Sequence, residues 1–252
     1  MNEIKETLAI LKARWYEVTL IIGLWFLHRL IVLTLRIYPD ITTLVSFVTI
    51  SMSLFILVVS TGFLRTVYLE QDKRQSLLDL MRIGKHFFWR ILGGGILLGF
   101  AMMFFPWLLS IIIKGDTISP LVNRMRFPFM QLILAKLTLL IPAIIIVADC
   151  SLSKSFGIMW KVKLLKAKPL LTFFLITGIV IPNLFMLFFP GFLRAHSSIT
   201  WGDAIFILYS TISHIMALMV SVMAVRFVSS LGIDCACQAF IEPTPPSAPP
   251  AP

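Results

Sequence analysis

Charged residues are scarce in this chain. They make up 13% of its 252 residues, whereas hydrophobic residues make up 58%. A soluble domain averages about 25% charged and about 45–50% apolar residues. Together with a mean hydropathy of +0.94, this scarcity excludes a soluble globular enzyme, a disordered chain and a fibrous repeat. The composition instead predicts an all-α polytopic membrane protein whose helices face lipid.

Cysteine is nearly absent as well. The three cysteines, Cys150, Cys235 and Cys237, are an odd set with no disulfide framework. Cys235 and Cys237 are one residue too close for a C-x-x-C motif, which makes a metal or redox site a weak interpretation. Two free thiols near the membrane, or S-acylation of those thiols, are the alternatives.

The chain also lacks the patterns on which catalysis depends. Acidic residues number only 12, and Glu17, Asp149 and Asp203 lie near the predicted ends of spans rather than as a pair. The sequence contains no H-E-x-x-H motif, no phosphate-binding loop and no serine-centred arrangement. We therefore predict no catalytic residue, no metal ligand and no cofactor, and we expect that the chain is not an enzyme.

Six apolar segments dominate what is present. They cover residues 18–35, 41–64, 91–113, 129–147, 170–192 and 204–228. The first segment is the weakest because His28 and Arg29 interrupt it, and a span needs about 20 apolar residues. Pro142 and Pro182 predict kinks rather than breaks, since neighbouring groups can satisfy the freed carbonyls. The predicted fold is therefore a six-helix transmembrane domain over residues 16–230.

Two further segments flank the predicted spans. In residues 1–15, apolar side chains recur at helical spacing among charged ones, which predicts an amphipathic helix lying on the membrane. These side chains are Ile4, Leu8, Leu11 and Trp15. Residues 231–252 are predicted to be a disordered cytoplasmic tail, because their final proline-rich run favours an extended, solvated backbone. A docking peptide is the alternative interpretation of this tail.

The basic residues are distributed unevenly about the spans. The net charge is +10, which in a soluble protein would favour nucleic-acid binding. Here 15 lysines and arginines flank the side that holds both termini, and 5 flank the opposite side. Short cytoplasmic loops carry such an excess. We therefore predict cytoplasmic termini, no nucleic acid, and anionic inner-leaflet lipid as the partner of the basic residues.

Two stretches between spans, 76–90 and 155–168, combine apolar and basic residues. Each is predicted to lie at the inner leaflet as a basic amphipathic helix. The basic residues expected to contact anionic lipid there are Arg82, Lys85, Arg90, Lys161, Lys163, Lys166 and Lys168. Because the two stretches look alike, they are either a true internal repeat or similar only in composition.

The most informative stretch is 141–180. A span ends there in proline and aliphatic residues, Asp149 follows, and a segment with Ser155 and Trp160 leads into the next span. This pattern resembles a superfamily of six-helix bacterial inner-membrane proteins, which includes the membrane domain attached to some glycerophosphoryl diester phosphodiesterases and uncharacterised stand-alone relatives. The resemblance covers about residues 60–230 and implies six helices in a bacterial inner membrane. It implies no reaction, because the sequence contains no phosphodiesterase catalytic domain.

Glycines near the start of the third span indicate close helix packing. Gly95 and Gly99 form a G-x-x-x-G motif. Small residues at this spacing let a neighbouring transmembrane helix approach closely. We therefore predict that these two glycines are helix-packing residues.

Basic residues inside the predicted spans point to a possible binding site. They are His28, Arg29, Lys136 and His214. A charged group deep in a span is costly and is a functional hypothesis by default. Arg29 and Lys136 fall at similar depths on antiparallel spans, with no carboxylate at that depth. They either share an outward-opening polar cavity that binds an anion or lipid headgroup, or snorkel to the outer interface.

The sequence thus favours one function class over two others. A non-enzymatic inner-membrane scaffold, or a subunit of a membrane or envelope assembly, is the leading expectation, with possible protein partners in that complex. A transporter or lipid-handling protein that uses the buried basic residues is the alternative. An integral-membrane enzyme comes third, because acids and nucleophiles are few.

Overall fold

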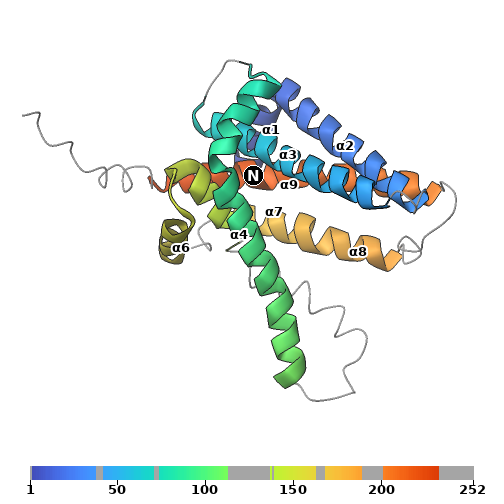
Figure 1. The fold of residues 1–252 in the computed structure, drawn as a ribbon. Helices are drawn as coiled ribbons and strands as arrows, with labels where there is room; N and C mark the ends of the chain where they lie inside the picture. The colour runs from blue at the N-terminus through green and yellow to red at the C-terminus, as the bar shows by residue number, and fades with distance from the viewer. Residues whose placement is uncertain are drawn as a thin grey trace, which may run out of the picture.

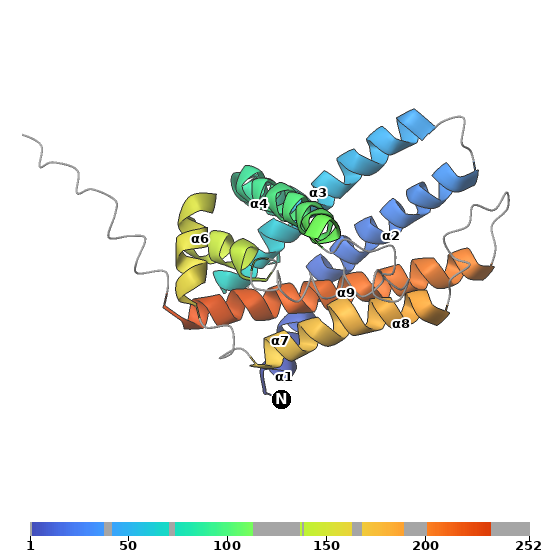
Figure 2. The ribbon, with the colours of Figure 1, turned by 90° about the horizontal axis from the view of Figure 1, so that it is seen from below.

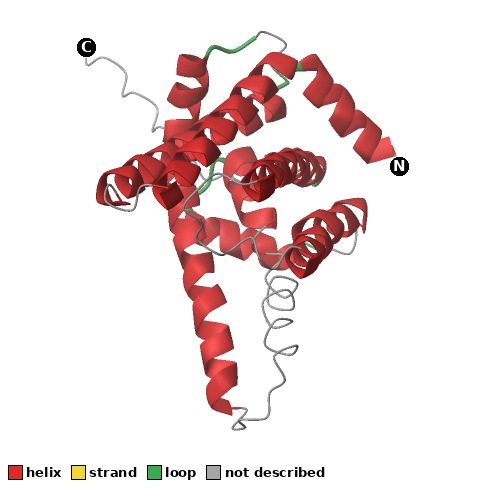
Figure 3. Cartoon of the chain, turned by 90° about the vertical axis from the view of Figure 1, so that its right-hand side faces the viewer, coloured by secondary structure: helices red, strands yellow, loops and turns green. Residues whose placement is uncertain are grey.

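The computed structural model describes residues 2–37, 42–70, 74–112, 137, 139–162, 168–188 and 201–232. All the regular elements among them are helices (Figure 3). They are α1 (Asn2–Ala13), α2 (Trp15–Ile37), α3 (Thr42–Tyr68), α4 (Leu77–Ile112), α6 (Leu152–Lys161), α7 (Lys168–Leu175), the π-helical turn η3 (Ile176–Val180), α8 (Ile181–Phe188) and α9 (Trp201–Ser230). A further helix, Leu139–Ala148, precedes α6. The predicted all-α fold is confirmed for this part of the chain.

Three helices are long and apolar enough to cross a membrane. The segments are Trp15–Leu33 in α2, Ser46–Tyr68 in α3 and Trp201–Ser230 in α9. A fourth candidate arises if Leu139–Ala148 and Leu152–Lys161 count as one span, although they meet at a bend of 115°. The chain is therefore a membrane protein by the length and composition of its helices, and six spans remain a prediction.

Helix α2 runs antiparallel to α3 and α9, which run in the same direction, so the start of α2 and the ends of α3 and α9 lie at one end of the bundle (Figure 2). Arg14, at the start of α2, donates from Nη1 to Thr66 Oγ1 near the end of α3, at 3.0 Å. Arg226, near the end of α9, pairs with Glu6 of α1 at 2.8 Å. We call this end of the molecule the N-terminal end. Arg65 also lies there, on the last turn of α3.

Helix α4 differs from the prediction. The sequence predicted an interfacial helix over 76–90 followed by a separate span, whereas the structure has one continuous helix. It begins at a capping box, in which Ser76 Oγ accepts from the Asp79 N–H at 3.2 Å and the Asp79 carboxylate accepts from the Ser76 N–H at 3.2 Å. From there it runs unbroken for 36 residues, about 54 Å at 1.5 Å per residue. In both views α4 runs across the direction of α9 rather than alongside it (Figures 1 and 2).

Two glycines allow the closest helix crossing. A Cβ added at Gly62 of α3 would lie 2.0 Å from the Leu80 oxygen, and one added at Gly84 of α4 would lie 1.8 Å from the Val58 oxygen. Helix backbones approach this closely only where side chains are missing. A Cβ at Gly95 or Gly99 meets no described atom within 4 Å, so their packing role stays a prediction.

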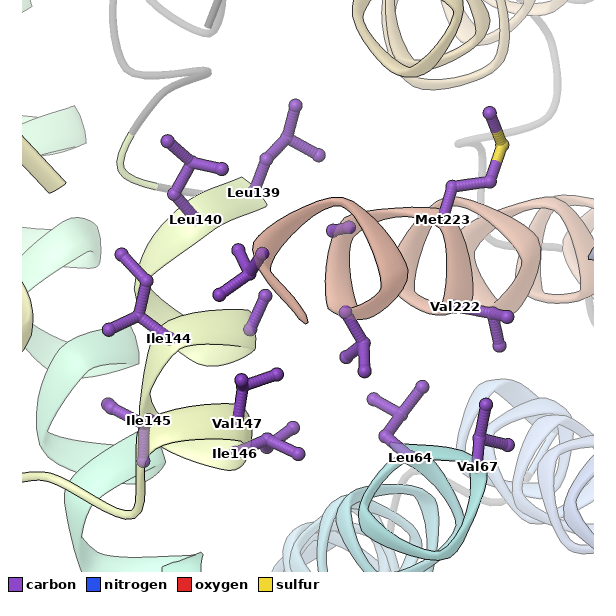
Figure 4. Packing of buried hydrophobic residues seen from close by; sticks show 14 of the residues in the cluster. Leu64, Val67, Leu139, Leu140, Ile144, Ile145, Ile146, Val147, Val222 and Met223 are labelled. Atoms are coloured by element: carbon purple, nitrogen blue, oxygen red, sulfur yellow. The ribbon is translucent and has the colours of Figure 1, made fainter. Parts of the chain in front are cut away.

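The helix Leu139–Ala148 forms the centre of the buried core. Nearly every one of its side chains is buried, as expected of a helix that is apolar on all sides. It packs against the ends of α3 and α9, where Leu64 and Val222 face it (Figure 4). Of the predicted fourth span, 129–147, only residue 137 and this last part lie within the described residues.

The predicted kink at Pro182 takes the form of a π-helical turn. Helices α7, η3 and α8 follow one another without a break. The Ile181 N–H bonds to the Ile176 oxygen, five residues back. Because proline has no N–H and its ring clashes with the preceding turn, a widened turn at Pro182 lets the helix continue.

The predicted amphipathic helix at the N-terminus is present as α1. Of the predicted apolar stripe, Leu11 is buried and Ile4 packs against the buried core, whereas Leu8 is 49% exposed and Trp15, at the start of α2, is 55% exposed. The stripe is therefore divided between the protein core and the outside of the molecule. Its predicted contact with the membrane surface is left to Leu8 and Trp15.

Candidate functional site

A cluster of polar and aromatic side chains lies between the three candidate spans. Helix α2 supplies Trp25, His28 and Arg29, α3 supplies Ser53, and α9 supplies His214. We call these five residues the Trp25 cluster. Trp25, His28 and Arg29 share one face of α2, because residues three and four apart in a helix lie on the same face.

Trp25 is the central member of this cluster. The His214 ring stacks on the Trp25 ring at a centroid distance of 4.1 Å and an interplanar angle of 8°. The His28 ring lies 5.3 Å from it. The Trp25 Nε1–H donates to the Ser210 oxygen at 3.2 Å, which ties α2 to α9. The indole therefore fixes the position of both histidines relative to the spans.

The Arg29 side chain points toward the middle of the candidate span in α2 rather than toward its near end. Its guanidinium carbon lies 4.3 Å from the centroid of Trp25, which is one turn deeper on α2 than Arg29 itself. Snorkelling would carry the group the other way, toward Ile37 at the near end of the helix. No described residue pairs with Arg29 or accepts a hydrogen bond from it, and its Nε atom is buried without a partner.

His28 is held by a hydrogen-bond chain from α3. The Ser53 hydroxyl donates to the Thr49 oxygen at 2.9 Å and lies 3.0 Å from His28 Nε2. Since the single hydroxyl proton is used on Thr49, Ser53 Oγ accepts from His28 Nε2–H. The remaining ring nitrogen of His28, Nδ1, is buried and has no described partner, and the same holds for Nε2 of His214.

The structure thus brings together three of the four residues for which the sequence left a shared polar cavity and snorkelling as alternatives. His28, Arg29 and His214 share the Trp25 cluster, whereas Lys136 lies outside the described residues. Sequence reasoning did not include Trp25 or Ser53. The available signal for Trp25 was its position three and four residues before His28 and Arg29, on their own helix face.

A second polar group lies at the N-terminal end, where the helix Leu139–Ala148 stops. Arg65 of α3 donates to the Ile146 oxygen and to the Val147 oxygen, the latter at 3.0 Å. A guanidinium at this place satisfies carbonyls that have no partner within the helix. The positive charge also complements the negative end of the helix dipole.

Asp149 follows that helix with a left-handed backbone, at φ 46°. Its carboxylate lies 2.7 Å from Arg90 Nη1 and 3.0 Å from His86 Nε2, both on α4. Burial raises the pKa of Asp149, but the hydrogen bonds and charges of Arg90 and His86 outweigh it, so the pKa lies below its ordinary value. These contacts fix the 115° bend between Leu139–Ala148 and α6.

An exposed stripe runs along α4 opposite its buried face. Leu78, Arg82, Lys85 and Trp89 recur at helical spacing and are all exposed, with Leu78 at 75% and Trp89 at 76%. We call these four residues the α4 stripe. The buried face, with Leu80 at its start, packs on α3.

The structure divides the seven residues predicted to contact inner-leaflet lipid. Arg82 and Lys85 belong to the α4 stripe, and Lys161 and Lys168 are exposed elsewhere. Arg90 is instead engaged by Asp149 and by the Cys150 oxygen, because its side chain turns toward the bend. Lys163 and Lys166 lie outside the described residues, as do Cys235, Cys237 and the rest of the predicted tail from residue 233 onward.

Within the described residues, no group of three or more His, Cys, Asp or Glu side chains is placed to hold a metal ion. The expectation of no metal, cofactor or catalytic residue is left as a prediction. Comparisons with protein-family models, curated proteins and solved structures find no match.

Proposed function

We propose that the chain is a non-enzymatic protein of the bacterial inner membrane, with six spans and cytoplasmic termini, that serves as a scaffold or subunit of a membrane assembly. The main support for this proposal is the α4 stripe, which exposes two large apolar and two basic side chains on one helix face. An anionic membrane surface accommodates both kinds of side chain in this stripe, because the apolar ones enter the interface and the basic ones attract anionic headgroups.

The described helices support the cytoplasmic orientation of the N-terminal end. The stripe lies on α4, which follows the end of α3 after a short connection, and the exposed lysines of α1 and α6 belong to flanking helices on the same predicted side. An excess of lysine and arginine in short connections marks the cytoplasmic side. The resemblance of residues 141–180 to the six-helix superfamily supports the same membrane and span number.

Exchange of Arg82 and Lys85 for glutamine tests the lipid contact. Each basic residue near an anionic surface contributes about 1 kcal/mol to association, so the double variant should retain less phosphatidylglycerol than the parent after purification in mild detergent. Lipid composition is measured by mass spectrometry. The matched control is the double variant Lys114→Gln, Arg124→Gln, which removes the same charge from the side predicted to lie opposite the termini. Equal loss in both double variants would attribute the effect to net charge and reject the stripe.

The scaffold role has its own test. Affinity purification of the full chain in mild detergent should recover a recurrent protein partner in an amount comparable to the chain. Recovery of the chain with lipid alone, at several detergent concentrations, would contradict a role as a scaffold or subunit.

A further inference from the structure

Arg29 carries a positive charge between apolar helices, and nothing in the described part of the chain neutralises it. A guanidinium has five N–H donors. None of them meets a described acceptor, and Nε is fully buried. The neighbours that face the group are the Trp25 ring and, at 5.9 Å, the Phe206 ring. Aromatic faces attract a cation, but they accept no conventional hydrogen bond.

We propose that the Trp25 cluster binds a phosphate group, either in the headgroup of a phospholipid or in a soluble phosphate compound. Arg29 is the principal ligand, because the planar fork of a guanidinium matches two phosphate oxygens at once. A bound phosphate would supply both the counter-charge and the acceptors that the described residues lack. The proposal goes beyond a scaffold role and does not depend on it.

The two histidines fit the same ligand. His28 Nδ1 and His214 Nε2 are buried without partners, and both rings are positioned around Trp25. A neighbouring anion favours the charged form of an imidazole. In that form each free nitrogen carries a proton and becomes a donor. Ser53 holds the other nitrogen of His28 and so fixes the direction of the donor.

The position of Arg29 allows a lipid to reach it. The Arg29 guanidinium lies over Trp25, which is eight residues from Leu33, where the candidate span ends, or about 12 Å at 1.5 Å per residue. A headgroup from the nearer leaflet has to enter the span by this distance to reach the guanidinium. Phe26, Leu27 and Leu30 are exposed beside it on α2, which provides an apolar surface for an acyl chain.

Nitrogen NMR of the histidine side chains tests the site directly. The chain has four histidines, so selective labelling with ¹⁵N-histidine gives few signals, and these can be assigned by single His→Gln exchanges. The full-length protein in detergent is titrated with dihexanoyl phosphatidylglycerol and, separately, with inorganic phosphate. The signals of His28 and His214 should shift and saturate. His86, which lies on α4 beside Asp149, is the internal control and should not follow them.

Exchange of Arg29 for leucine should raise the concentration needed for half-saturation at least tenfold, whereas Lys12→Gln should change it less than twofold. Saturation with phosphatidylglycerol alone identifies a lipid ligand, and saturation with inorganic phosphate identifies a soluble one. If Arg29→Leu does not fold, Arg29→Lys replaces it, and loss of the fork should still weaken binding. The proposal is wrong if neither probe moves the two signals, or if the Arg29 variant saturates like the parent. The test of the α4 stripe changes Arg82 and Lys85, and the test of the phosphate site changes Arg29. Failure of one proposal therefore does not imply failure of the other.

Discussion

At the scale of single residues, Asp149 has two roles: its backbone forms a turn, and its carboxylate forms an ion pair with Arg90. Its left-handed φ of 46° is one that asparagine adopts as readily as aspartate. The variant Asp149→Asn therefore removes the charge and keeps the turn. Because the carboxylate is 42% exposed, we expect a loss of only about 0.5–1 kcal/mol in the free energy of unfolding at pH 7.

This loss should depend on pH in one direction. The folded-state pKa of Asp149 lies below its ordinary value of 3.8. The carboxylate therefore stabilises the fold above that value, and its contribution disappears as the pH falls through the folded-state pKa. Thermal unfolding of parent and variant in detergent should differ at pH 5 and converge as the pH falls below 3.8. A difference that stays unchanged over that acid range would contradict this account of the ion pair.

Residue-level chemistry was predictable from the sequence only in part. His28, Arg29 and His214 stand out because charged or polar groups are rare in apolar spans. Their common neighbour Trp25 does not stand out, because tryptophan is ordinary in a membrane helix. Arg90 was assigned to lipid from its place in a basic segment. Its partner Asp149 is 59 residues away in the sequence, and pairing over that distance depends on the fold.

At the scale of helices, the crossing of α3 and α4 depends on two missing side chains. Alanine at Gly84 would put a Cβ 1.8 Å from the Val58 oxygen. The backbones would have to separate, and overpacking of this kind costs about 1–3 kcal/mol. We expect Gly84→Ala to lower the unfolding temperature of the purified protein clearly.

The matched control is Gly23→Ala on α2, where an added Cβ meets nothing within 4 Å. In a helix interior, alanine is more favourable than glycine by about 0.5–1 kcal/mol, so this variant should be as stable as the parent or slightly more so. Equal stability of Gly84→Ala and Gly23→Ala would show that α3 and α4 do not approach as described.

The pattern of apolar residues in the sequence predicted which segments are helical, but it did not predict how the helices cross. The stretch around Gly93–Gly95 was interpreted as the start of a span, because glycine and apolar residues follow a basic segment there. In the structure α4 passes through it without interruption. The helix Leu139–Ala148 was interpreted as the end of a lipid-facing span, yet it is buried in protein. Hydrophobicity alone does not distinguish lipid from protein as the neighbour, since both are apolar.

At the scale of the whole molecule, the candidate spans form a membrane bundle with basic residues exposed near its N-terminal end. Of the three candidate spans, α2 runs antiparallel to α3 and α9, and α1 contacts the end of α9. The phosphate site proposed around Trp25 lies within this bundle, and the α4 stripe lies outside it. If the N-terminal end is cytoplasmic, the stripe meets anionic lipid on one side and the Trp25 cluster is reached from the other.

The most direct measurement of this claim is cysteine labelling in intact cells with a membrane-impermeant maleimide. In a background with Cys150, Cys235 and Cys237 replaced by serine, one cysteine is placed at Glu70, between α3 and α4, or at Trp201, at the start of α9. We expect labelling of the Trp201→Cys protein in intact cells, and labelling of the Glu70→Cys protein only after the cells are permeabilised. Labelling of Glu70→Cys in intact cells would contradict the orientation, and with it the proposed inner-leaflet contact.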